Sequence, residues 1–131
     1  MIRYLFIILF AMSFFQASAN TNINEVMKLY SQNGSLSMDA ERGKKLWEKK
    51  NVGKNGKNRE CSTCHGSDLN KAGKHVKSGK VIDPMALSVN KERYTDLKKV
   101  KKWFKRNCKW TYGRECTDQE KVDLLKYLSQ F

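Results

Sequence analysis

The sequence of 131 residues predicts an all-α fold in one small domain. Apolar residues recur at helical spacing in four segments, and few stretches alternate between apolar and polar residues as strands do. A long central segment, 51–94, is rich in Gly, Lys, Asn and Ser and has no clear periodicity. Because a loop of that length is uncommon in a compact domain unless it is functional, we expect it to wrap around a site.

Two helices are predicted before the central segment. The first has one apolar face, at i, i+3, i+4 and i+7, made of Ile23, Val26, Met27 and Tyr30. The second covers about 39–50, with Asp39 as its N-cap. Gly43 lies inside it, where a glycine costs about 1 kcal/mol relative to alanine. We therefore expect another backbone or ring to approach closely at Gly43.

Two further helices are predicted after the central segment. The third can be capped by Thr95, and its expected buried face consists of Val100, Trp103, Phe104 and Asn107. The fourth opens with a capping box formed by Thr117 and Glu120. Its expected buried stripe consists of Val122, Leu125 and Leu128. We expect the second helix to cross this last helix, with Gly43 near Leu124, Tyr127 or Leu128.

The first nineteen residues have the layout of a secretory signal. Arg3 supplies the positive start, 4–15 is almost wholly apolar, and 17–19 offers small residues before a cleavage site. The apolar run is shorter than the about 20 residues that span a bilayer, and an uncleaved anchor is the alternative. We expect 1–19 to be a signal peptide, 20–131 to be one domain, and the mature protein to be periplasmic.

The chain is strongly basic, with a formal net charge of +13, or +12 once Arg3 is removed with the signal. Nucleic acid is a common partner of such chains, but export and the lack of a nucleic-acid motif argue against it. Lysine clusters also steer acidic protein partners and are compatible with peripheral membrane association. The alternative is a solvated surface without a partner, because charge patterning alone does not decide.

The sequence CSTCH at 61–65 indicates the chemistry. C-x-x-C-H in an exported chain is the attachment signature of a c-type haem. Two thiols three positions apart can form thioethers with the two vinyl groups of one porphyrin, and the next residue can place its imidazole at the iron. We predict that Cys61 and Cys64 attach one haem c, that His65 is the proximal ligand, and that the chain has the cytochrome c fold.

Three other uses of this motif are less well supported. A zinc ribbon needs a second close ligand pair, which the spacing of Cys108 and Cys116 does not supply. A thioredoxin-like pair needs a βαβ context, and this chain is predicted to be all-α. A disulfide between Cys61 and Cys64 would close a very tight ring.

The residues alone leave the sixth iron ligand open. Met85, next to Pro84, suits an electron carrier with histidine and methionine ligands. Met38 is placed less conveniently, Met27 is expected in the core, and His75 lies in a lysine-rich stretch expected at the surface. Asn107 shares a predicted helix face with Trp103, although asparagine also commonly ends helices because it tolerates the left-handed conformation.

Several blocks resemble the sphaeroides haem protein family of monohaem, high-spin c-type cytochromes. They are ERGKKLW (41–47), CSTCH (61–65), SGKVIDPMALSVNKERYTD (78–96) and KVKKWFKRNCKW…GRECTDQEKVDLLKYL (99–128). The first two are generic to cytochromes c, and the last is distinctive. KKNVGKNGKNRE (49–60) departs from the family pattern, since it is longer and more basic than usual. This departure concerns partner docking rather than the iron ligands.

The resemblance implies a distal haem ligand, Asn107, and a disulfide beside it between Cys108 and Cys116. It implies that Met85 packs near the haem without ligating iron, and Trp103 is expected beside the haem as well. An amide oxygen is a hard, weak donor that suits ferric iron better than ferrous iron. In this family the asparagine leaves on reduction, and the iron can then bind oxygen, carbon monoxide or nitric oxide. The family's partners are a dihaem cytochrome c and membrane cytochromes b.

The predicted function is that of a periplasmic haem protein that accepts electrons and binds a diatomic gas, rather than a classical enzyme. A plain electron carrier with His65 and Met85 as ligands is one alternative. A small haem enzyme acting on peroxide or nitric oxide is another, although His75 is the only other histidine available for acid–base work. The disulfide is expected to be structural, with a redox role as the minor alternative.

Overall fold

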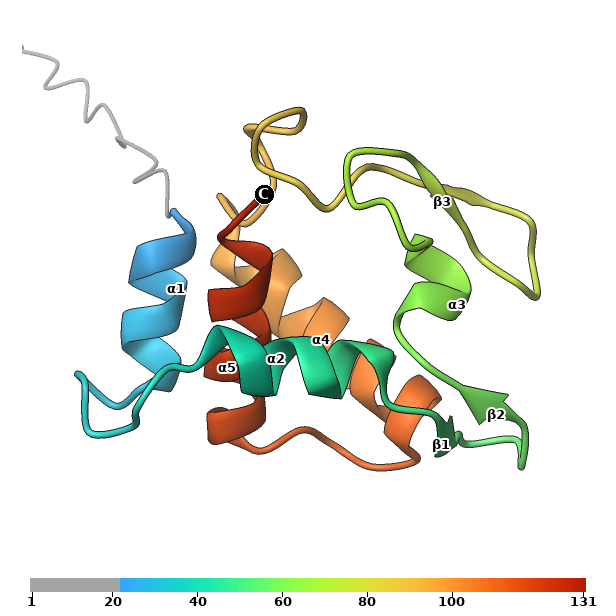
Figure 1. Cartoon of the computed structure of the whole chain (residues 1–131), viewed down its shortest axis with the longest axis horizontal. Helices are drawn as coiled ribbons and strands as arrows, with labels where there is room; N and C mark the ends of the chain where they lie inside the picture. Colours follow the sequence, from blue (N-terminus) through green and yellow to red (C-terminus); the bar gives the residue numbers. More distant parts are fainter. Residues whose placement is uncertain (1–21) are drawn as a thin grey trace, which may run out of the picture.

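The computed structural model describes residues 22–131, so the predicted signal segment, 1–19, lies outside the described residues. The described chain contains five helices and two two-stranded sheets. The helices are α1 (Ile23–Tyr30), α2 (Ala40–Glu48), α3 (Ser62–His65), α4 (Leu97–Tyr112) and α5 (Asp118–Leu128). Figure 1 shows the four longer helices gathered together, with α3 and the strands at the other end of the molecule. The predicted all-α class is confirmed.

The central segment is more ordered than its sequence predicts. It contains the strands β1 (Asn51–Val52), β2 (Asn58–Arg59), β3 (Gly73–Lys74) and β4 (Val81–Ile82). Strand β1 pairs antiparallel with β2, and β3 pairs antiparallel with β4. Ladders of two residues are too short for an alternating pattern to appear in the sequence. None of the helices in this part of the chain is long and apolar enough to cross a membrane.

Helix ends follow the predicted caps with one exception. The Asp39 carboxylate accepts a hydrogen bond from a backbone N–H in the first turn of α2, and Thr117 forms the predicted capping box with Glu120. The prediction of Thr95 as the cap of α4 is wrong, because Asp96 caps this helix. The Thr95 hydroxyl instead donates to the Glu92 carbonyl at 2.8 Å, which closes the preceding turn.

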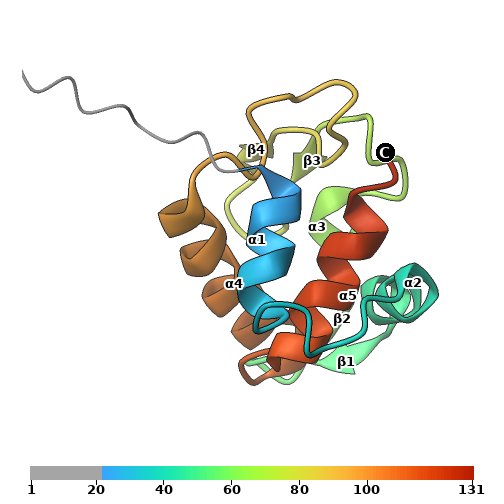
Figure 2. The same cartoon turned by 90° about the vertical axis from the view of Figure 1, so that its left-hand side faces the viewer.

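The crossing of α2 and α5 forms the centre of the helical part. A Cβ on Gly43 would collide with the Asp123 carbonyl and lie 2.8 Å from the Tyr127 Cβ, so the predicted close approach is confirmed. Asp123 is 2% exposed, and its carboxylate accepts a hydrogen bond from the Arg42 Nε at 2.8 Å. Figure 2 shows α1 beside α5, with α2 crossing α5 from the other side.

Helix α4 presents a different face to the core from the one predicted. Its core side consists of Val100, Phe104, Cys108 and Thr111. Trp103 is 49% exposed and Asn107 is exposed, so their placement on the buried face is wrong. The sequence pattern fits either stripe, because aromatic residues line both. Asn107 does not end the helix, which continues to Tyr112 and stops at Gly113 with φ 72°.

Candidate functional site

The predicted attachment motif forms one turn of helix. The His65 N–H donates to the Cys61 carbonyl at 3.2 Å, and the turn ends at Gly66 with φ 77°. The Cys61 N–H donates to the Trp47 carbonyl at 3.2 Å, which fixes the turn to the end of α2. Cys61 and Cys64 are free thiols on this turn. The turn therefore presents two thiols and, directly after them, an imidazole.

The imidazole of His65 is largely enclosed by protein. The Trp47 ring lies 5.4 Å from it between centroids, and a Cβ on Gly73 would lie 2.8 Å from the His65 Cα. Burial, and to a smaller extent the Arg93 cation, lowers the pKa of His65 to about 4. A neutral imidazole is the form that ligates a metal. The His65 Nδ1 is buried and lacks a hydrogen-bond partner among residues 22–131.

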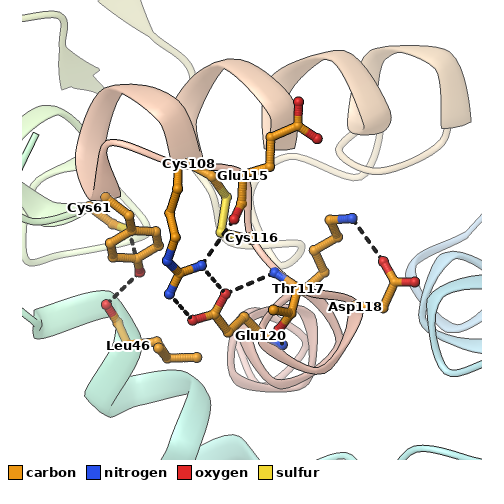
Figure 3. The surroundings of a disulfide bond; sticks show 11 residues. Leu46, Cys61, Cys108, Glu115, Cys116, Thr117, Asp118 and Glu120 are labelled. Atoms are coloured by element: carbon orange, nitrogen blue, oxygen red, sulfur yellow. Dashed lines mark hydrogen bonds and ion pairs between the residues drawn. A yellow bond between two sulfur atoms is a disulfide. The ribbon is translucent and has the colours of Figure 1, made fainter. Parts of the chain in front are cut away.

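The thiol of Cys61 is held in place from the end of α4. The Tyr112 hydroxyl donates to the Leu46 carbonyl at 2.7 Å and lies 3.7 Å from the Cys61 Sγ (Figure 3). Burial raises the pKa of Cys61 to about 11. A protonated, buried thiol is a poor nucleophile and a poor metal ligand at neutral pH. The surroundings of Cys61 therefore do not favour thiolate redox chemistry or metal binding by this sulfur alone.

Trp110 connects α4 to both sides of this motif. It follows Asn107 by three positions, so the two residues lie one turn apart and are neighbours on the helix surface. The guanidinium carbon of Arg59 lies 3.6 Å from the Trp110 ring centroid, and the His75 ring centroid lies 5.5 Å from it. Arg59 precedes Cys61 by two positions, and His75 follows β3. His75 lies at the surface as expected, but one side of its ring packs against Trp110.

The side chain of Met85 is buried and hydrogen-bonded to Arg93. Its side chain is 8% exposed, and its Sδ accepts a hydrogen bond from the Arg93 Nη2 at 2.7 Å. Its backbone N–H donates to the carbonyl of Leu69, a residue shortly after His65, at 3.0 Å. The structure therefore places Met85 next to the segment that follows the histidine. Met27 is buried in the core as expected, and Met38 is exposed.

The disulfide joins α4 to the start of α5. Cys108 and Cys116 are bonded, with their Cα atoms 5.6 Å apart (Figure 3). The loop between them is further held by Arg114, which donates to both Glu120 carboxylate oxygens at 2.7 and 2.8 Å. Because the two sulfurs are bonded to each other, they do not form the second ligand pair of a zinc ribbon. The bridge follows Asn107 directly and fixes that turn of α4.

Sequence reasoning missed the contacts that connect α4 to the motif. Arg59, Trp110 and Tyr112 come from segments about fifty residues apart, and no local pattern predicts that they meet. The only available signal was the position of Trp110 one turn beyond Asn107.

The donor set fits one group well. Two free thiols on one turn, followed by an imidazole with a buried, unpartnered nitrogen, suit a porphyrin attached through thioethers. In such a site Cys61 and Cys64 would hold haem c and His65 would ligate its iron.

Comparison with known proteins agrees with this reading. Residues 33–128 match a family model described as a domain of unknown function, DUF1924. Cytochrome c-type protein SHP of Cereibacter sphaeroides is 38% identical over 112 residues, which are 86% of each chain. The structure of oxidised SHP, described as an oxygen-binding cytochrome c, matches with a TM-score of 0.78 at 38% identity, covering 86% of this chain and 99% of that one. Oxidised cytochrome c'' of Methylophilus methylotrophus matches with a TM-score of 0.70 at 29% identity, covering 82% and 92%.

The fold and the motif together define a c-type cytochrome, which binds haem c covalently. More particularly, the chain belongs to the DUF1924 family and to the sphaeroides haem protein family. The predicted family and the predicted cytochrome c fold are both confirmed.

Proposed function

We propose that this chain is a periplasmic monohaem cytochrome that accepts electrons and binds a diatomic gas at the iron once Asn107 has left on reduction. Haem c, when bound, supplies the redox-active iron and the coordination position for the gas. The observation that carries the proposal is the packing of Trp110, three positions after Asn107 on α4, against Arg59 and His75 on the two sides of the motif. The description of SHP as an oxygen-binding cytochrome c supports the same function.

Each residue of the site has a different proposed role. The thiols of Cys61 and Cys64 would hold haem c through two thioether bonds. His65 would be the permanent ligand, because the turn of α3 and the Trp47 ring hold its imidazole. The amide oxygen of Asn107 would be the second, releasable ligand, because it is a hard, weak donor that suits ferric iron better than ferrous iron.

Absorption spectra of the ferric and dithionite-reduced protein test this proposal. The ferric protein should be high-spin or mixed-spin, and the reduced protein should bind carbon monoxide rapidly. Asn107→Ala should change the ferric spectrum strongly, and Met85→Leu, as the matched control, should leave it nearly unchanged. A reduced protein that stays low-spin and does not bind carbon monoxide would instead support the plain electron carrier with His65 and Met85 as ligands.

The partners and the location are part of the same proposal. The exposed lysines of α4 and of the β1–β2 hairpin suit an acidic redox partner, such as a dihaem cytochrome c or a membrane cytochrome b. Mass spectrometry of the periplasmic protein should find one haem per chain and a mature N-terminus at Asn20. A mass that retains 1–19, or a second haem, would contradict this part of the proposal.

A further inference from the structure

A three-residue stack connects α4 to both sides of the attachment motif. Arg59, Trp110 and His75 form this stack: the Arg59 guanidinium carbon lies 3.6 Å from the indole centroid, and the two aromatic rings are 5.5 Å apart at 35°. Arg59 lies at the end of β2, two positions before the first cysteine of the motif. His75 follows β3, where a Cβ on Gly73 would press on the His65 Cα. The stack therefore fixes the position of α4 relative to the segments on both sides of the motif.

Forming the stack costs more desolvation free energy than packing apolar side chains, because it buries polar groups. Arg59 is 7% exposed and has no carboxylate partner within residues 22–131; its guanidinium donates one long hydrogen bond, 3.4 Å, to the Trp110 carbonyl. The Trp110 Nε1 is also buried and unpartnered among these residues. Burying a charge without an ionic partner costs free energy, and the cation over the indole offsets only part of that cost. A planar guanidinium stacks on an indole in a defined orientation, so we attribute the role of Arg59 to geometry.

We propose that the Arg59–Trp110–His75 stack is a positioning device that sets how readily Asn107 leaves the iron. The inference rests on the proposed function, because it takes Asn107 as the distal ligand. Trp110 follows Asn107 by three positions, so both side chains project from the same side of α4. Any movement of the indole is passed to Asn107 through a rigid turn of helix. Loosening the stack should therefore let Asn107 dissociate more often.

The test measures cyanide binding to the ferric holoprotein by stopped flow. At high cyanide the rate should reach a limit set by Asn107 dissociation, and this limit reports on the stack. Arg59→Leu and His75→Ala should each raise the limiting rate about tenfold, the factor that corresponds to about 1.4 kcal/mol, and should raise the high-spin fraction of the ferric spectrum. His75→Phe keeps an aromatic ring and should stay within about twofold of the parent, since ring packing is retained.

Two further variants separate geometry from charge. Arg59→Lys keeps the charge but loses the planar group, so it should behave like Arg59→Leu. Lys105→Gln removes a charge two positions from Asn107 at an exposed lysine outside the stack and should leave the limiting rate unchanged. If Arg59→Lys behaves like the parent, charge and not position is responsible, and the proposal is wrong.

The outcomes distinguish this inference from the function on which it rests. An Asn107→Ala protein with an unchanged ferric spectrum would remove the ligand assignment, and the positioning role with it. A changed Asn107→Ala spectrum together with parental limiting rates in Arg59→Leu and His75→Ala would overturn the stack alone. Should Arg59→Leu fail to fold, the two His75 variants test the positioning role: a raised limiting rate in His75→Ala but not in His75→Phe supports it, and equal rates contradict it.

Discussion

Removing the Cys108–Cys116 bridge should lower the free energy of unfolding by about 2.6 kcal/mol. The two cysteines are separated by 8 positions, so the bridge closes a loop of about nine residues. The chain-entropy relation for that length gives about 8.7 cal/mol/K, or about 2.6 kcal/mol at 25 °C. For a domain of this size, 1 kcal/mol shifts the melting temperature by about 4 °C, which predicts a loss of about 10 °C.

Thermal unfolding followed by circular dichroism is the assay, with the oxidised holoprotein as reference. The double variant Cys108→Ala/Cys116→Ala also leaves small cavities, because both side chains are buried. The parent with its disulfide reduced keeps both sulfurs, and comparing it with disulfide-intact protein in the same iron oxidation state gives the entropic part alone. A disulfide-reduced parent that melts within about 2 °C of the disulfide-intact protein would refute the loop-entropy reasoning.

Three other perturbations follow from single contacts. Gly43→Ala should cost about 1–3 kcal/mol in chemical denaturation, because overpacking against α5 outweighs the gain in helix propensity; equal or higher stability would show that the crossing can relax. Tyr112→Phe loses the hydroxyl near Cys61 and should cost about 1 kcal/mol by the same measurement; no change would mean that water replaces the hydrogen bond. The Arg114 guanidinium lowers the pKa of Glu120 from its usual 4.5, so this pair stabilises the protein above about pH 4.5 and less as the pH falls below it. Glu120→Gln should therefore flatten the dependence of the urea midpoint on pH below 4.5, and a profile parallel to that of the parent would contradict the assignment.

Features that depend on neighbouring residues could be predicted from the sequence. The caps at Asp39 and Thr117 follow from side chains that bond to backbone groups within the same turn. The motif CSTCH carries its own geometry, because all of its members lie on one helical turn. Gly43 could be interpreted because a glycine inside a helix needs a reason, and the close approach of α5 supplies it.

Features that depend on the rotation of an element were not predictable. The pattern along α4 is compatible with two apolar stripes, and the partners that decide between them are distant in sequence. The stack on Trp110 requires Arg59 and His75 to arrive from two separate hairpins whose strands are only two residues long. Only resemblance to the family links Asn107 to the iron, and its own residue context predicts a helix end, which the structure does not show.

Two restraints act on the turn of α4 that carries Asn107. Cys108 and Trp110 are two positions apart, which places them about 200° apart around the helix. The disulfide therefore holds one side of the turn and the stack holds the other, with Asn107 between them. While either restraint remains, the turn can shift only a little. Removing both, in Arg59→Leu with Cys108→Ala/Cys116→Ala, should raise the limiting cyanide rate by more than the product of the separate factors. A simple product would mean that the two restraints act independently and that Asn107 is not held between them.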